Sequence, residues 1–309
     1  MDIGNQWAQE NLPRDWLDQL QMPSEDDWRE FWKACEKALA SGDVEDAAAL
    51  MPYAETAARV LSKVPGGEDY AAWLQQRIDY FEIAAAAVKS VPEPVAPSQP
   101  GPAGAPPSPR PVRGRITIMP SPGAAPPTPV ISIPVKQRRR AVAISPNLWK
   151  RKLANRPVPA SARDLVPQLK RVFRSEGIPE KLVWIAEVES SMNPKARNPS
   201  GAAGLFQLMP ATAQRFGLRT APLDERKHPE KSARAAARYL KFLYGEFHSW
   251  PLAVAAYNVG EGRIKSLLES EKGGSFEDIA PRLPIETQMY VPKVQAVISL
   301  REGGPGLTE

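Results

Sequence analysis

The chain has 309 residues, of which 42% are hydrophobic and 24% are charged, so it can bury a core of ordinary size. Its single cysteine, Cys35, excludes an intramolecular disulfide, and with only two histidines a zinc site of His and Cys is excluded as well. The net charge is +5, and no stretch approaches the roughly 20 apolar residues of a membrane span.

The N-terminus has neither a basic region nor an apolar region of the kind that forms a signal peptide. We therefore expect either a cytoplasmic protein or a start that lies downstream of an export signal.

Residues 1–90 are acidic and have a helical pattern. Ser24 begins a capping-box sequence, and the aromatic residues that follow it lead to Cys35, which we expect to be a small core residue. Gly42 ends this helix, Asp43 caps a second helix that runs toward Val64 with a break or kink at Pro52, and a third helix covers 68–89. The pattern predicts a small helical bundle of unknown role, which is a candidate site for envelope protein partners.

Residues 91–147 form a proline-rich basic segment. Fifteen prolines fall within 91–135, and residues 91–160 carry a net charge of +10. This composition favours extended, polyproline-like backbone, so we interpret 91–147 as a largely disordered linker. The alternative is contact with an anionic surface such as wall polymer, lipid headgroups or nucleic acid, but we expect no nucleic-acid partner.

From about Ser145 the pattern becomes helical again and predicts an α-helical domain over 148–309. The expected helices cover 162–176, 179–191, 210–216, 229–247, 250–258, 261–269 and 285–301. The segment between Asn193 and Pro210 has no helical period. The fold class expected for the whole chain is therefore mainly α.

The helix expected over 179–191 carries two glutamates that face different ways. At 100° per residue Glu189 falls on the apolar stripe with Leu182 and Ile185, whereas Glu187 points away and is expected in solvent. A carboxyl group on an apolar face has a raised pKa, which suits a general acid at a glycosidic oxygen. The alternative is a structural glutamate whose partner is one of three arginines: Arg215, Arg234 and Arg238.

Four motifs follow Glu189 in a fixed order. They are Glu189-Ser190-Ser191-Met192-Asn193-Pro194, Gly204-Leu205-Phe206-Gln207-Leu208-Met209-Pro210, Ala256-Tyr257-Asn258-Val259-Gly260-Glu261-Gly262 and Glu286-Thr287-Gln288-Met289-Tyr290-Val291-Pro292-Lys293. In order and spacing they resemble the lytic transglycosylases with a soluble-lytic-transglycosylase catalytic domain, and most closely the membrane-bound lytic transglycosylase D type. The resemblance covers about residues 160–301.

The resemblance implies a lysozyme-like α-helical catalytic domain with a long sugar-binding groove. It implies that Glu189 is the single catalytic acid and base. The substrate-binding residues that it implies are Ser190, Gln207, Tyr257, Asn258 and Tyr290.

The implied substrate is the glycan strand of peptidoglycan, the implied product carries a 1,6-anhydromuramoyl end, and no cofactor is expected. The implied location is the cell envelope or periplasm. Two alternatives stay open. A lysozyme-type hydrolase needs a second carboxylate, for which Asp224 and Glu261 are candidates, and a non-catalytic wall-binding protein would keep the groove without the acid.

Overall fold

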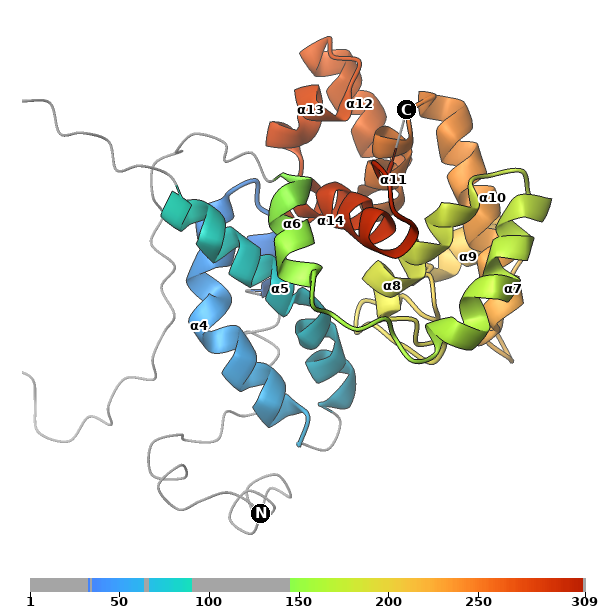
Figure 1. Cartoon of the computed structure of the whole chain (residues 1–309), viewed down its shortest axis with the longest axis horizontal. Coiled ribbons are helices and arrows are strands. Elements are labelled where there is room, and N and C mark those ends of the chain that lie inside the picture. Colours follow the sequence, from blue (N-terminus) through green and yellow to red (C-terminus); the bar gives the residue numbers. More distant parts are fainter. Residues whose placement is uncertain (1–32, 34, 64–66, 91–144, 308–309) are drawn as a thin grey trace, which may run out of the picture.

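The computed structural model describes residues 33, 35–63, 67–90 and 145–307, and these residues are mainly helical (Figure 1). The α-helices are α4 (Val44–Leu61), α5 (Glu68–Ser90), α6 (Pro146–Leu153), α7 (Ala162–Ser175), α8 (Ile185–Ser190), α9 (Pro210–Arg215), α10 (Pro229–Phe247), α11 (Trp250–Val259), α12 (Glu261–Glu271), α13 (Phe276–Ile279) and α14 (Ile285–Glu302). Three short 3-10 helices are η1 (Glu180–Trp184), η2 (Glu225–Lys227) and η3 (Ala280–Arg282). The expected mainly α fold class is confirmed for these residues.

Helices α4 and α5 pack against each other as a helical hairpin. Asp43 caps α4 by accepting a hydrogen bond of 2.9 Å from the backbone of Glu45, as the sequence predicts. Helix α4 continues through Pro52 to Leu61, so the predicted break at Pro52 is wrong. Cys35 is fully buried, and this burial raises the pKa of its thiol to about 12, which suits a core residue.

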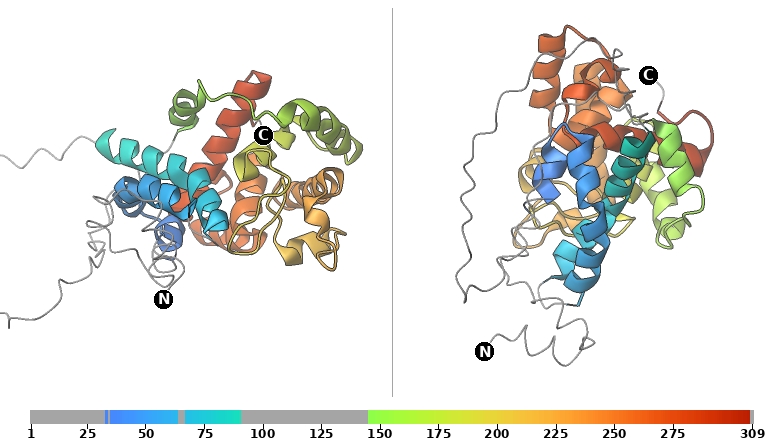
Figure 2. Two further views of the ribbon diagram at one scale, coloured as in Figure 1. Left: turned by 90° about the horizontal axis from the view of Figure 1, so that it is seen from below. Right: turned by 90° about the vertical axis from the view of Figure 1, so that its left-hand side faces the viewer.

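Helix α14 occupies the middle of the molecule, with α6 on one side and α8 and α11 on the other (Figures 1 and 2). Helix α7 packs on η1 and α10 through an apolar face that contains Leu169 and Phe173. This arrangement surrounds the short helix α8 with other elements, and α8 is the helix that carries Glu189.

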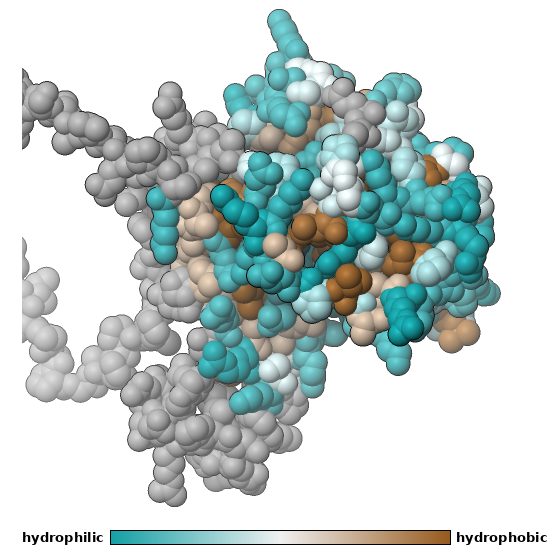
Figure 3. All heavy atoms as spheres, in the orientation of Figure 1, coloured by the Kyte–Doolittle hydropathy of each residue, from teal (hydrophilic) through white to brown (hydrophobic). Residues whose placement is uncertain are grey.

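One hydrophobic core runs through both halves of the described chain. It includes Phe81 of α5, Trp149 of α6 and Leu205 near α8. The face seen in Figure 3 is mostly hydrophilic, with small, separate hydrophobic areas. The hairpin is therefore packed onto the C-terminal half and shares its core.

Several expected boundaries differ in the structure. The helix expected over 179–191 is η1 followed by α8, with Pro179 as the cap of η1. Helix α6 begins at Pro146, so a domain boundary at 148 would cut it. Residues 193–209 have no α-helix, as expected, and contain only isolated bridges that join Ala203 to Arg197 and to Leu208.

The capping box at Ser24 and the linker up to residue 144 lie outside the described residues. Within the part that is described, no helix combines the length and the apolar character that crossing a membrane requires.

Candidate active site

Glu189 lies in the last turn of α8 with its side chain half-buried. The hydroxyl of Tyr290, on α14, donates a hydrogen bond of 2.5 Å to Oε1 of Glu189. Burial raises the pKa of Glu189 to about 7, although the bond from Tyr290 and the charge of Arg77 act in the opposite direction. A carboxyl group with this pKa keeps its proton in part of the molecules at neutral pH. Because the side chain is only half-buried, it also remains accessible to solvent.

The three arginines that were possible partners of Glu189 pair elsewhere. Arg215 binds Glu261 at 2.6 Å, while Arg234 and Arg238 bind Glu176 at 2.8 and 3.2 Å. A structural ion pair between Glu189 and one of these arginines is therefore wrong.

Ser190 is buried and links α8 to the irregular segment that follows. Its hydroxyl lies within hydrogen-bond distance of two backbone carbonyl oxygens, at 3.0 Å from that of Ala186 and 2.9 Å from that of Leu205. Ser191 and Met192 then adopt left-handed backbone, with φ of 53° and 61°, which ends the helix. Ser190 thus fixes the position of the 204–207 segment relative to Glu189 from inside the protein.

The segment from Gly204 to Gln207 can form only because position 204 is glycine. Gly204 has φ of +81°, and a Cβ atom there would lie 1.9 Å from the carbonyl oxygen of Arg226. Arg226 is itself buried and donates to the carbonyl of Leu208 at 2.9 Å. Gln207 is half-buried, and its side-chain amide donates to the carbonyl of Gly204 at 2.8 Å.

Tyr257 and Asn258 lie at the end of α11 and join that helix to the other motifs. The Tyr257 hydroxyl donates to the carbonyl of Phe206 at 2.7 Å. Asn258 accepts a bond of 2.7 Å from the hydroxyl of Thr287 on α14. Both side chains are half-buried, so each keeps some surface open to solvent.

Among the predicted site residues, Tyr257 and Tyr290 are the two whose charges interact with Glu189. Burial raises the pKa of both Tyr257 and Tyr290 well above the ordinary value, and the charge of Glu189 contributes to both shifts. Hydrogen bonds therefore join Glu189 directly to Tyr290, and they join Ser190 and Tyr257 to the backbone of residues 205–206 and Asn258 to Thr287.

The two candidates for a second catalytic carboxylate are both held in ion pairs. Asp224 binds Arg226 at 2.8 Å, and this bond lowers the pKa of Asp224. Burial opposes ionisation of Glu261, but the hydrogen bonds from Arg215, from its own backbone and from Tyr239, together with the charge of Arg215, outweigh burial and lower the pKa of Glu261. Both carboxylates are thus fixed as anions that hold their arginines in place.

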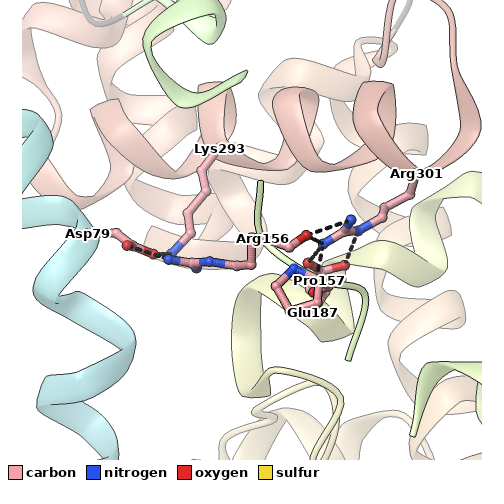
Figure 4. A network of polar contacts seen from close by, with 6 residues as sticks. All are labelled: Asp79, Arg156, Pro157, Glu187, Lys293 and Arg301. Carbon is pink, nitrogen blue, oxygen red and sulfur yellow. Dashed lines mark hydrogen bonds and ion pairs between the residues drawn. The ribbon is translucent and has the colours of Figure 1, made fainter. Parts of the chain in front are cut away.

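Glu187 is buried, so the prediction that it lies in solvent is wrong. Arg301 of α14 donates to its carboxylate at 2.6 and 2.9 Å, and also to the backbone carbonyl of Arg156 (Figure 4). Helix α8 is enclosed on both faces, so Glu187 is buried although it points away from Glu189. A buried ionisable side chain needs a charged partner, which Arg301 supplies.

The same network reaches Lys293, which the motif contains but which the sequence gives no role. Lys293 is buried and lies 3.7 Å from Asp79 of α5 (Figure 4). The centre of the Tyr80 ring lies 4.3 Å from the Lys293 ammonium group. Burial lowers the pKa of Lys293 to about 8, and the charge of Asp79 partly offsets this. No local sequence signal pairs residues so far apart in the chain.

No group of three or more His, Cys, Asp or Glu side chains that could hold a metal ion occurs among the residues that the structure describes.

The chain matches one protein-family model. Residues 171–279 match the family described as the Transglycosylase SLT domain. This part of the chain, which contains the first three of the four motifs, is therefore similar to that family.

Part of the chain is also similar to curated proteins that are named lytic murein transglycosylases. Membrane-bound lytic murein transglycosylase D of Escherichia coli K12 is 37% identical over 128 residues, which are 40% of this chain and 28% of that protein. Soluble lytic murein transglycosylase of Salmonella typhimurium is 36% identical over 121 residues, or 36% of this chain and 19% of that protein. The chain thus spans less than a third of the length of these relatives.

A similar solved structure is that of the 70-kDa soluble lytic transglycosylase of Escherichia coli. It is 30% identical, with a TM-score of 0.40, and the match covers 50% of this chain and 26% of that one.

Proposed function

We propose that this protein is a peptidoglycan lytic transglycosylase that cleaves the β-1,4 bond between N-acetylmuramic acid and N-acetylglucosamine without consuming water. The SLT domain and the names of the curated relatives support the class of reaction. The observation that carries the proposal is the carboxyl group of Glu189, half-buried, bound by Tyr290 and with a pKa of about 7.

Glu189 acts as the single acid and base. Its proton passes to the glycosidic oxygen as the bond from that oxygen to C1 of the muramic ring breaks. The N-acetyl oxygen of the same sugar bonds to C1 as the leaving group departs. The C6 hydroxyl then attacks C1 and releases the N-acetyl oxygen, and its proton returns to the carboxylate of Glu189.

This mechanism needs no second carboxylate, and the ion pairs of the two candidate carboxylates favour it over a lysozyme-type hydrolase. Asp224 and Glu261 are both occupied by arginines, so neither is free to position a water molecule. A non-catalytic wall-binding protein is disfavoured as well, because it has no use for a half-buried glutamate with a raised pKa.

Gln207, Tyr257 and Asn258 are the residues that we assign to sugar binding. Amide groups offer a donor and an acceptor to sugar hydroxyl and N-acetyl groups, and a tyrosine ring offers a flat apolar surface. Ser190, which is buried, shapes the site through its backbone contacts. The partner is the glycan strand, the place of action is the cell envelope, and the reaction needs no cofactor.

The proposal is tested by Glu189→Gln in the full chain, because glutamine keeps the shape of glutamate and loses the proton. We expect a fall of about a thousandfold or more in the release of soluble fragments from purified peptidoglycan, with an unchanged melting temperature. Glu277→Gln, at an exposed position on α13, is the matched control and keeps full activity. Activity near that of the wild type in Glu189→Gln would overturn the proposal.

A further inference from the structure

Helix α5 of the N-terminal hairpin is joined to α14 by two ion pairs. Arg77 binds Glu286 at 2.9 Å, and Asp79 lies 3.7 Å from Lys293. Glu286, Tyr290 and Lys293 are spaced by four and three residues, so they share one face of α14. The tyrosine that binds Glu189 therefore lies between two contacts that α5 supplies.

The chain just before α4 holds the beginning of α14. The backbone amide of Ile285 donates to the carbonyl of Ser41 at 2.6 Å, and the side chain of Gln288 donates to that of Gly42 at 3.5 Å. Helix α5 also contacts α8 directly. Helices α8 and α14, which carry Glu189 and Tyr290, are thus both in contact with the N-terminal hairpin or with the turn that leads into it.

Arg77 and Glu286 lie in a place where water screens their charges only partly. The side chain of Arg77 is 17% exposed, and its guanidinium lies 4.5 Å from the centre of the Trp73 ring. Its Nε atom is buried and has no hydrogen-bond partner within the described part of the chain. Because water screens them less here, the charges of both residues interact more strongly with neighbouring ionisable groups than they would at the surface.

The groups that face Glu189 come from three helices. Tyr290, Glu286 and Lys293 belong to α14, Tyr257 belongs to α11, and Arg77 and Tyr80 belong to α5. The charge of Arg77 favours the carboxylate form of Glu189, whereas that of Glu286 favours the acid form. The two members of one ion pair therefore act on Glu189 in opposite directions.

We propose that α5 is a wall of the active site, and that Arg77 and Glu286 are positioning residues that hold Tyr290 in place and balance the charge around Glu189. The proposal rests on the function proposed above and gives the hairpin a role in the reaction. The N-terminal segment is then part of the catalytic unit, and a partner that moves α5 would change the activity.

The test compares Arg77→Met and Glu286→Gln in the full chain. The readout is the rate of fragment release from peptidoglycan between pH 5 and 9. In the wild type the rate falls as the pH rises through about 7, because the acid loses its proton. We expect the midpoint of this fall to move up by about 0.5 to 1 pH unit in Arg77→Met and down by a similar amount in Glu286→Gln.

Two further variants serve as controls. Arg77→Lys keeps the positive charge and returns the midpoint to near that of the wild type. Arg174→Met, on α7, breaks an exposed ion pair with Glu180 and leaves the profile unchanged. Helices α7 and α5 lie on opposite sides of the view in Figure 1.

A purely structural role would lower the rate at every pH without moving the midpoint, and that result would overturn the proposal. Shifts in the same direction for Arg77→Met and Glu286→Gln would also overturn it. If Arg77→Met fails to fold, Glu286→Gln alone tests the proposal: a downward shift of the midpoint supports it, and an unchanged midpoint overturns it. Failure of the underlying function looks different, because Glu189→Gln would then be as active as the wild type.

Discussion

The two glutamates of α8 have different partners, and Glu187 is buried whereas Glu189 is half-buried. Glu189 is bound by a neutral hydroxyl from Tyr290, whereas Glu187 is bound by the guanidinium of Arg301 at 2.6 Å. A neutral partner leaves the carboxyl group of Glu189 able to hold a proton, whereas Glu187 and Arg301 form a buried ion pair. The choice of partner thus separates a candidate acid from a structural anion two residues away.

Glu187→Gln is therefore expected to destabilise the fold. The side chains of Glu187 and Arg301 are only 7% and 10% exposed, so the variant leaves a buried charge without its counterion. We expect a loss of about 2–4 kcal/mol in the free energy of unfolding, measured by denaturant titration. Activity per folded molecule stays within a few-fold of the wild type, in contrast to Glu189→Gln. An unchanged unfolding midpoint would show that the pair with Arg301 contributes nothing.

At the scale of the element, the irregular segment between α8 and α9 depends on close approach between backbones. Gly201 and Gly204 both have positive φ. A Cβ atom added at Gly204 would lie 1.9 Å from a backbone carbonyl oxygen, whereas one added at Gly201 would have nothing within 4 Å. The carbonyl belongs to Arg226, whose side chain holds the same segment. This contact fixes the backbone of the segment that carries Gln207.

Gly204→Ala is expected to disrupt this segment, and Gly201→Ala is the matched control. The control costs about 1 kcal/mol for its backbone conformation, because nothing lies within 4 Å of the added carbon. Gly204→Ala meets the additional clash, so we expect at least about 2 kcal/mol more and a loss of activity in the folded fraction. Thermal melting and fragment release measure both. Equal effects at the two positions would contradict the packing argument.

The sequence predicts most helices well because their signals are local. Helix α10 begins at Pro229 and ends at Phe247, as the periodicity and the flanking residues indicate. Helix α8 is different, because it is short, follows a 3-10 helix and is enclosed on both faces. A helical wheel with one apolar and one polar face therefore places Glu187 wrongly, while Glu189, on its apolar face, is half-buried in the structure.

At the scale of the whole molecule, the sequence divides the chain at a linker, whereas the described parts on either side of it share one core. The pair of Asp79 and Arg156, at 2.6 Å, and the edge-on contact of Tyr80 with Trp149, at 5.3 Å, join α5 to the region around α6. Such contacts depend on residues about 70 positions apart, and no periodicity within one element reveals them. The motifs predict the site residues, whereas the ion pairs that join the hairpin to α14 become visible only in the fold.

The central claim is that Glu189 works as the single acid and base and that the substrate supplies its own nucleophile. The C6 hydroxyl is tethered to the reacting ring, so its effective concentration can reach about 10⁵ M or more, far above that of water at roughly 55 M. Ring closure should therefore outcompete hydrolysis, provided that no carboxylate positions a water molecule. Asp224 and Glu261 are bound by Arg226 and Arg215 instead.

The most direct test is the mass of the products after digestion of purified peptidoglycan in ¹⁸O-labelled water. We predict muropeptides with 1,6-anhydro ends, which are lighter than reducing ends by the mass of one water molecule and carry no label. Mostly reducing ends that contain ¹⁸O would contradict the account and would identify the protein as a hydrolase.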